Sequence, residues 1–274
     1  MGVDYGFDVH PTLGPGCQDL YEAFLEEVVQ KYKQAVPPTL ASHQGKKDGQ
    51  DVMDMELPQG PSFERLLDLE KMNPAQLPIQ SQLIHLRNVL SLNPTLVLVL
   101  TRAASLNLPN WYLAAGALSQ TIWNNVSSLP PETGIHDYDL VYYDASDLSY
   151  EAEDVVIQAG KQLFADIPVE VEIRNQARVH LWYEKKFGLA RPANKSVEDG
   201  IDSWISTSAM LGVRLDEHGE WIFYAPRGLS DFFNMVVRPN TAFAKRENYE
   251  KKVERWKAIW SGLKVEAWPE NEST

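Results

Sequence analysis

The sequence predicts an α+β fold with α/β-like features, in which a small mixed β-sheet packs against helices and further helices are added at both ends. Short runs with alternating side chains, at 137–142 and 169–174, predict strands. Longer segments with apolar residues at helical spacing surround them. Hydrophobic residues make up 44% of the 274 residues, which is enough for a substantial core.

Composition narrows the classes of function. The net charge of -13 opposes generic nucleic-acid binding, because contacts with phosphates supply most of that affinity. The single cysteine, Cys17, excludes an internal disulfide and fits a reducing, cytoplasmic location. No run reaches the length and apolarity of a transmembrane helix, and the first residues do not resemble a signal peptide, so we expect no membrane partner.

Residues 1–78 are expected to form an N-terminal helix and a flexible linker. The helix is predicted over 18–36, and residues 37–62 are polar and rich in Gly, Pro and Asp, which favours a loosely ordered segment. A short helix is expected over 63–71. We predict one catalytic domain over 79–265 and a disordered tail over 266–274.

Two helices are predicted next, over 79–92 and 95–106. Asn93 followed by Pro94 is typical of a helix N-cap with proline in the first turn. The run 96–100 is apolar all round, so this helix should be buried, and a strand is the competing interpretation.

A short strand over 111–113 should then turn through small residues into a helix. Gly116 tolerates unusual backbone dihedrals, and Ala115 and Ala117 beside it let a ligand approach the backbone closely. The N–H groups at the start of the helix suit the phosphates of a nucleotide.

Paired carboxylates follow on two strands. Asp137 and Asp139 alternate with apolar positions and therefore point to the same face, with Cα atoms roughly 6–7 Å apart. Mg²⁺ is commonly held by one or two carboxylates together with substrate phosphates. After a helix that Ser149 should cap, Glu170 and Glu172 share one face of the next strand. Either could complete a three-carboxylate cluster.

The C-terminal half should contain a helix that ends at Gly188, a loop over 189–196, a helix over 196–204, a hairpin over 211–225 and a helix over 228–237. A last helix should begin at Asn240. Its basic side chains are expected on the outer face, interleaved with glutamates, and solvation is the simplest explanation of them: Lys245, Arg246, Lys251, Lys252 and Arg255.

These motifs, in this order, resemble the polymerase-β-like nucleotidyltransferase superfamily, and most closely its branch of nucleotidyltransferase family proteins. The resemblance covers about 83–263. It implies nucleotidyl transfer with Mg²⁺ or Mn²⁺, Asp137 and Asp139 as metal ligands, and Glu172 as the third acid. The matching stretches are Trp111–Gly116, Gln120–Asn124, Gly134–Asp144, Asp147–Glu151, Arg174–Tyr183, Gly212–Leu215, Ala225–Asp231 and Arg238–Asn240. Two departures are Ala117, where the superfamily prefers Gly or Ser, and His136 before the first aspartate.

The remaining site predictions concern the nucleotide. The turn Ala115–Ala117 would hold the triphosphate, and Asn175 and Arg178 are candidate nucleotide contacts. Asn175 could equally cap a helix, and Arg178 could pair with a local carboxylate.

The predicted function is metal-dependent transfer of a nucleoside monophosphate from a nucleoside triphosphate to an unidentified acceptor. The alternatives are a catalytically silent nucleotide-binding regulator, a metal-dependent hydrolase of phosphorylated small molecules, and a scaffold that binds partners through its basic last helix.

Overall fold

The computed structural model describes residues 73–270. The helices and the linker predicted within 1–72, and residues 271–274 of the predicted tail, lie outside these residues. The helices are η1 (Pro74–Gln76), α3 (Ile79–Ser91), α4 (Pro94–Ala104), α5 (Gly116–Val126), α6 (Tyr150–Leu163), η2 (Gln176–Arg178), α7 (Val179–Phe187), α8 (Val197–Asp202), η3 (Thr207–Ala209), α9 (Ser230–Phe233) and α10 (Arg246–Ile259). The strands are β1 (Tyr112–Ala114), β2 (Asp137–Tyr142), β3 (Glu170–Asn175), β4 (Gly212–Leu215), β5 (Trp221–Tyr224), β6 (Val236–Val237) and β7 (Lys264–Val265).

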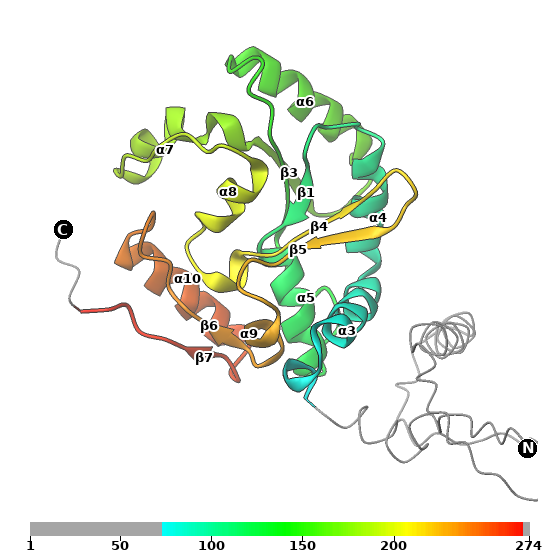
Figure 1. Ribbon diagram of the computed structural model, residues 1–274, viewed down its shortest axis with the longest axis vertical. Helices are drawn as coiled ribbons and strands as arrows, with labels where there is room; N and C mark the ends of the chain where they lie inside the picture. Colours follow the sequence, from blue (N-terminus) through cyan, green and yellow to red (C-terminus); the bar gives the residue numbers. More distant parts are fainter. Residues whose placement is uncertain (1–72, 271–274) are drawn as a thin grey trace, which may run out of the picture. The chain divides into compact units, whose positions relative to one another are not determined.

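A five-stranded mixed sheet in the order β3-β2-β1-β4-β5 forms the centre of the fold (Figure 1). β2 and β3 are parallel and are joined through α6, whereas β1 pairs antiparallel with both β2 and β4. β4 and β5 form the predicted hairpin. The predicted α+β architecture with a small mixed sheet is therefore confirmed.

The main core lies between one face of the sheet and helices α3, α4 and α5. Leu113, Leu140 and Val213 on three neighbouring strands are fully buried in it, together with Leu96 and Leu100 of α4. No single helix among residues 73–270 is long and apolar enough to cross a membrane. α3 and α4 pass that test only as a pair bent by 100°, and their apolar side chains lie in this core.

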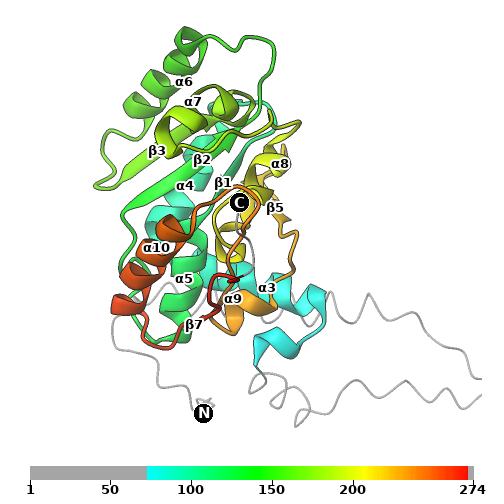
Figure 2. The same ribbon diagram turned by 90° about the vertical axis from the view of Figure 1, so that its left-hand side faces the viewer.

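Two smaller clusters complete the packing. On the other face of the sheet, Val197 and Ile201 of α8 cover Tyr112 and Val141. α10 packs through tryptophans on α5, and Figure 2 shows the two helices side by side at the end of the sheet where β2 begins. The second face is thus only partly covered, and this leaves the start of β2 accessible.

Local capping explains several helix boundaries. The side chain of Asn93 accepts a hydrogen bond from the N–H of Leu96 at 2.9 Å, as expected for the N-cap of α4. Ser149 caps α6 in the same way, by accepting from the N–H of Ala152 at 3.2 Å. Gly188 ends α7 with a φ of 63°, a left-handed conformation that glycine adopts at little cost.

Two predictions near the C-terminus are wrong. The helix expected over 228–237 is the short α9, because Met235 has a positive φ of 55° and Val236 and Val237 join a two-stranded parallel pair with β7. The last helix begins at Arg246, not at Asn240. Asn240 instead donates its backbone N–H to the carbonyl of Ile205 at 2.9 Å, and its side-chain amide donates to the carbonyls of Asp202 and Trp204 at the end of α8.

Candidate active site

Asp137 and Asp139 project from the same face of β2. Between them, Tyr138 is 1% exposed in the main core, which fixes the alternation of the strand. Asp137, at the first position, is exposed, and Asp139 is half-buried. The pair therefore lies at the open start of the strand, with one carboxylate near solvent and one deeper.

The register of β2 with β3 places two glutamates next to these aspartates. Glu170 is the neighbour of Asp137, and Glu172 is the neighbour of Asp139. Partners in a parallel pair point to the same face on strands about 4.8 Å apart. Glu172 also forms an ion pair with Arg174. Glu172 is thus the glutamate beside the deeper aspartate.

Burial and the neighbouring acids raise the pKa of Asp139. Burial, followed by the charge of Asp137 and a smaller contribution from Glu172, raises the pKa of Asp139 to about 7. An ionised carboxylate in this position is therefore costly unless a positive charge lies nearby. A divalent cation bound between Asp137 and Asp139 would supply that charge, so the donor set and its electrostatics fit a hard metal ion.

The acids do not form a complete metal cage by themselves. Within residues 73–270, no group of three or more His, Cys, Asp or Glu side chains converges as a metal site. Two aspartates are nevertheless sufficient when the substrate supplies the other ligands, because Mg²⁺ usually keeps waters and binds substrate phosphates.

The turn between β1 and α5 lies beside Asp139. Ala114, the last residue of β1, is paired with Asp139 on one side and with Gly212 on the other. Ala115 follows with φ 62° and ψ -135°, and its N–H donates to the carbonyl of Leu211 at 3.1 Å. α5 begins directly afterwards, with no side-chain N-cap and no acidic residue in its first turn.

This arrangement favours an anion near Asp139. The first N–H groups of a helix have no partners within the helix, and their partial positive charge attracts phosphates. In the structure, the predicted turn Ala115–Ala117 therefore lies beside the predicted metal ligand Asp139.

Asn175 and Arg178 lie away from the acids. Asn175 is paired with Tyr142, which is three residues beyond Asp139, or about 10 Å along β2. Its side-chain oxygen accepts from the N–H groups of Asp144 and Ala177, and its amide donates to the carbonyl of Asp144 at 2.8 Å. Its polar atoms are thus used inside the protein, which favours the capping role over nucleotide contact.

The guanidinium of Arg178 is also used internally. It forms a buried ion pair with Glu153 of α6 and donates to the carbonyl of Leu148 at 2.9 Å. Only 7% of Arg178 and 4% of Glu153 are exposed. This geometry supports the local ion pair and gives no support to a contact between Arg178 and the nucleotide.

Sequence reasoning missed the environment of one basic residue of α10. Lys252 was expected on the outer face of the last helix, but it is half-buried, and its Nζ lies 5.4 Å from the centre of the Trp256 ring. The spacing of four residues between Lys252 and the buried Trp256 was the available signal, because residues i and i+4 share a helix face.

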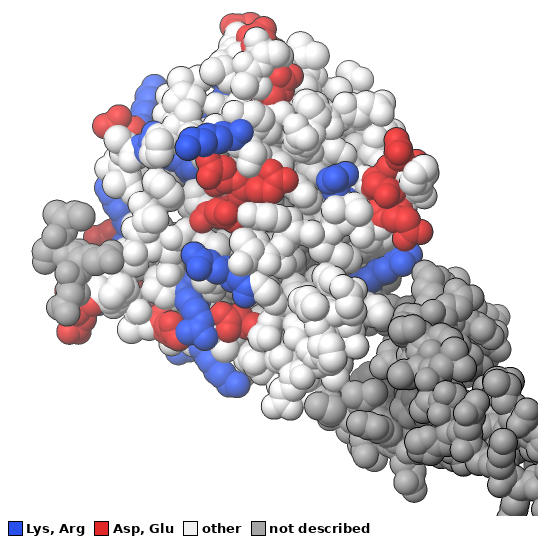
Figure 3. All heavy atoms as spheres, in the orientation of Figure 1, with Lys and Arg blue, Asp and Glu red and all other residues white. Residues whose placement is uncertain are grey.

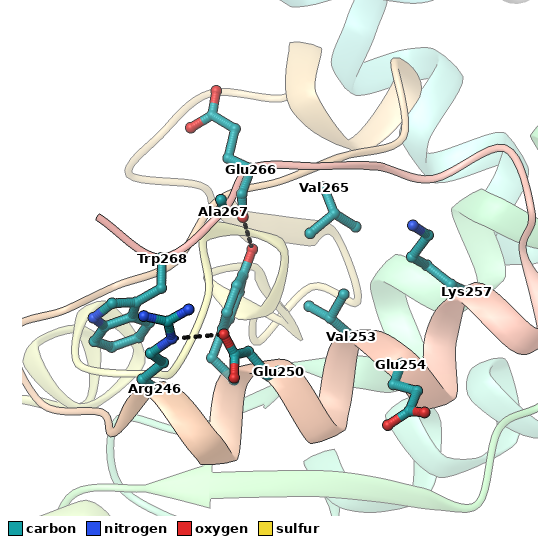
Figure 4. A pocket seen from close by; sticks show the side chains of 10 residues that line it. Arg246, Glu250, Val253, Glu254, Lys257, Val265, Glu266, Ala267 and Trp268 are labelled. Atoms are coloured by element: carbon teal, nitrogen blue, oxygen red, sulfur yellow. Dashed lines mark hydrogen bonds and ion pairs between the residues drawn. The ribbon is translucent and has the colours of Figure 1, made fainter. Parts of the chain in front are cut away.

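A separate hollow of about 420 Å³ lies between α10 and the C-terminal segment (Figure 4). Val253 and Trp268 contribute to its walls, and the hydroxyl of Tyr249 donates to the carbonyl of Glu266 at 2.8 Å beside it. None of the predicted site residues lines this hollow. It has no part in the arrangement of the acids.

A mixed sheet with paired aspartates on one strand, next to a strand that turns through small residues into a helix, defines the class of polymerase-β-like nucleotidyltransferases. The chain belongs to the nucleotidyltransferase family, whose model, described as "Nucleotidyltransferase", matches residues 101–265. The chain is accordingly a transferase.

A solved structure supports this assignment. Its title reads "The NMR structure of the protein reveals a CCA-adding enzyme head domain". It is 25% identical to this chain with a TM-score of 0.54, and the match covers 71% of this chain and 100% of the other. No curated protein matches the sequence.

Proposed function

We propose that the chain transfers a nucleoside monophosphate from a nucleoside triphosphate to an acceptor, in a reaction that depends on Mg²⁺ or Mn²⁺. The observation that carries this proposal is the position of Asp137 and Asp139 beside the start of α5. Carboxylates for a cation and helix N–H groups for phosphates thus meet at one end of the sheet.

In this mechanism, Asp137 and Asp139 would hold the metal ion, and Glu172 lies beside Asp139. When bound, the ion orients the α- and β-phosphates and lowers the pKa of the attacking hydroxyl. The N–H groups of Ala117 and its neighbours in the first turn of α5 bind phosphate oxygens. The acceptor oxygen forms a bond with the α-phosphorus, and the bond from that phosphorus to the pyrophosphate oxygen breaks.

The hydroxyl proton needs a base, and Glu172 is the group that we assign. It lies next to Asp139 and is held there by Arg174. A carboxylate within reach of a metal-activated hydroxyl is a suitable proton acceptor.

The first experiment is calorimetric titration of the protein with ATP, GTP, CTP and UTP, with Mg²⁺ and with EDTA. We expect the wild type to bind at least one nucleotide only in the presence of Mg²⁺. The double variant Asp137→Asn/Asp139→Asn should lose this metal-dependent binding, because it lacks the carboxylates that would hold the ion.

The matched control is Glu217→Gln/Glu220→Gln, which removes two carboxylates at the tip of the β4–β5 hairpin. Their side chains are 86% and 67% exposed, and the control should bind like the wild type. A folded wild type that binds none of the four nucleotides would contradict the proposal. Tight binding without transfer of labelled nucleotide to any acceptor would favour a silent regulator.

A further inference from the structure

Arg191 lies over two aromatic rings that come from different parts of the chain. The central carbon of its guanidinium is 5.0 Å from the centre of the Tyr183 ring in α7 and 5.1 Å from that of Phe243, in the segment before α10. The hydroxyl of Tyr183 donates to the carbonyl of Phe243 at 2.6 Å. The guanidinium is therefore held where these two segments meet.

Asn194 fixes the position of this guanidinium. Its side-chain oxygen accepts a hydrogen bond from Nη2 of Arg191, and its Nδ2 donates to the carbonyl of Gln176 at 2.9 Å. The backbone carbonyl of Asn194 accepts from the hydroxyl of Tyr143 at 3.1 Å. Since Gln176 directly follows β3 and Tyr143 directly follows β2, the loop that carries Arg191 is attached to the C-terminal ends of both strands.

This loop lies on the face of the sheet that carries the acids. Side chains alternate along a strand, so Asp139, Val141 and Tyr143 point to the same face, where Tyr143 packs with Val141. Four residues separate Asp139 from Tyr143, or about 13 Å along the strand direction. In Figure 2, α7 and α10 lie on the side of the sheet that faces the viewer. Arg191 and the acids thus share one face and lie toward opposite ends of β2.

The charge of Arg191 is not paired within the described part of the chain. Among residues 73–270, no carboxylate lies within 4.0 Å of its guanidinium. Figure 3 shows acidic side chains over α8, between basic side chains over α7 and α10. In α8, however, Asp199 accepts from the N–H of Lys195 and Asp202 from the hydroxyl of Tyr224, both at 2.9 Å. These acids therefore serve other groups.

Most N–H groups of Arg191 also lack an acceptor among residues 73–270. Only Nη2 donates a hydrogen bond there, and Nε is buried without a partner. A guanidinium presents five N–H groups in a planar fork that matches the oxygens of a carboxylate or phosphate. Burial lowers the pKa of Arg191, so an anion beside it would favour the charged form.

We propose that Arg191 binds a phosphate or carboxylate group of the acceptor. This inference rests on the proposed function, because it assigns a chemical class to the molecule that receives the nucleotide. The hydroxyl of the acceptor would reach the α-phosphorus beside Asp139, and its anionic group would lie toward the C-terminal end of β2. The acceptor is thus anionic and long enough to extend along one face of the sheet.

Two observations favour the acceptor over the nucleotide as the source of the anion. The start of α5, where we place the phosphates of the nucleotide, lies beside Asp139, whereas the loop of Arg191 is attached at the other ends of β2 and β3. The net charge of -13 also repels anions at a distance, so an anionic acceptor needs an unpaired cation near the acids.

The test is NMR titration of the full chain, labelled with ¹⁵N, with inorganic phosphate and separately with acetate. The reporters are the buried Nε–H of Arg191 and the side-chain amide of Asn194, which remains in every variant. We expect at least one anion to shift both signals saturably. The shift should be the same when Mg²⁺ and the α,β-methylene analogue of the best-bound nucleoside triphosphate are present at saturation. Response to phosphate alone or to acetate alone identifies which group the acceptor carries.

Three variants locate the anion. Arg191→Met removes the guanidinium and keeps a stem of similar length, and it should weaken the response of Asn194 by about tenfold or more. Arg191→Lys keeps the charge without the fork and should lose less. Lys195→Met removes an exposed positive charge from the same loop and is the matched control, which should respond like the wild type.

Four results would overturn the assignment. If the folded wild type responds to neither anion but binds nucleotide with Mg²⁺, Arg191 is no anion site and the proposed function stands. If Arg191→Met responds like the wild type and has only a lower melting temperature, the role of Arg191 is structural. If the nucleotide analogue itself shifts Nε–H of Arg191 and abolishes the response to the anions, the site belongs to the nucleotide. If the wild type binds no nucleoside triphosphate, the proposed function is wrong and the assignment of an acceptor group fails with it.

Discussion

Ala115 adopts a backbone conformation that glycine tolerates better than alanine. Its φ of 62° and ψ of -135° lie outside the regions that L-residues with a Cβ prefer. This strain sits between the strand that pairs with Asp139 and the helix whose N–H groups face the proposed phosphate site. Strain of this kind persists only where the surrounding structure enforces it, as the hydrogen bond to Leu211 does here.

We predict that Ala115→Gly stabilises the protein by about 1 kcal/mol, because relief of the strain outweighs the extra chain entropy of glycine in the unfolded state. Urea unfolding measures the change. Ala117→Gly, two residues later inside α5, is the control and should destabilise by about 1 kcal/mol, as glycine does within a helix. A loss of stability in both variants would show that Ala115 is not strained.

At this same scale, the sequence predicted part of the site. Alternation along one strand was sufficient to put Asp137 and Asp139 on one face. It could not choose between Glu170 and Glu172, because both lie on the same face, and only the register with β2 shows that Glu172 is beside Asp139. Lys252 was missed because its environment depends on how α10 packs against α5, which no local pattern specifies.

The buried ion pair between Glu153 and Arg178 joins two elements, α6 and the turn after β3. We predict that Arg178→Met destabilises the protein by about 3–5 kcal/mol, because it leaves the carboxylate of Glu153 buried without its partner. Glu153→Leu/Arg178→Met should recover much of this loss, since neither charge remains. Chemical denaturation of the single and double variants measures both effects.

Nucleotide binding by the double variant then tests the role of Arg178. We expect wild-type affinity, because the guanidinium lies away from the acids and is used by Glu153 and Leu148. A folded double variant that had lost nucleotide affinity would restore Arg178 as a nucleotide contact. That result would also mean that the bound nucleotide extends as far as the C-terminal end of β3.

Helices and strands with strong local signals were predicted well, and those without them were not. The N-caps Asn93 and Ser149 and the helix end at Gly188 are short-range features, and the structure confirms them. β6 and β7 contain two residues each and form only because Met235 turns the chain toward the segment after α10. Contacts between such distant segments leave no periodic pattern in the sequence.

At the scale of the whole molecule, the charge of the protein constrains how it can bind nucleotides. A net charge of -13 repels polyphosphates at a distance. A cation on Asp137 and Asp139 would reverse the sign of the field locally, and the N-terminus of α5 would add to it. Affinity should therefore reside in a few groups at one end of the sheet, and a broad basic surface is not required.

The position of these groups gives the last prediction. The chain divides at residues 66 and 67, and the second unit, Leu67–Thr274, contains the matched family region and every residue of the proposed site. Its hydrophobic clusters are built from residues of the sheet and its helices.

We therefore expect a fragment of residues 67–274 to unfold cooperatively and to bind Mg²⁺ and nucleoside triphosphate with an affinity within about threefold of the full chain. Thermal melting followed by calorimetric titration checks both points, with Asp137→Asn/Asp139→Asn in the same fragment as the control. A fragment that folds but does not bind, while the full chain does, would show that residues 1–66 contribute to the nucleotide site.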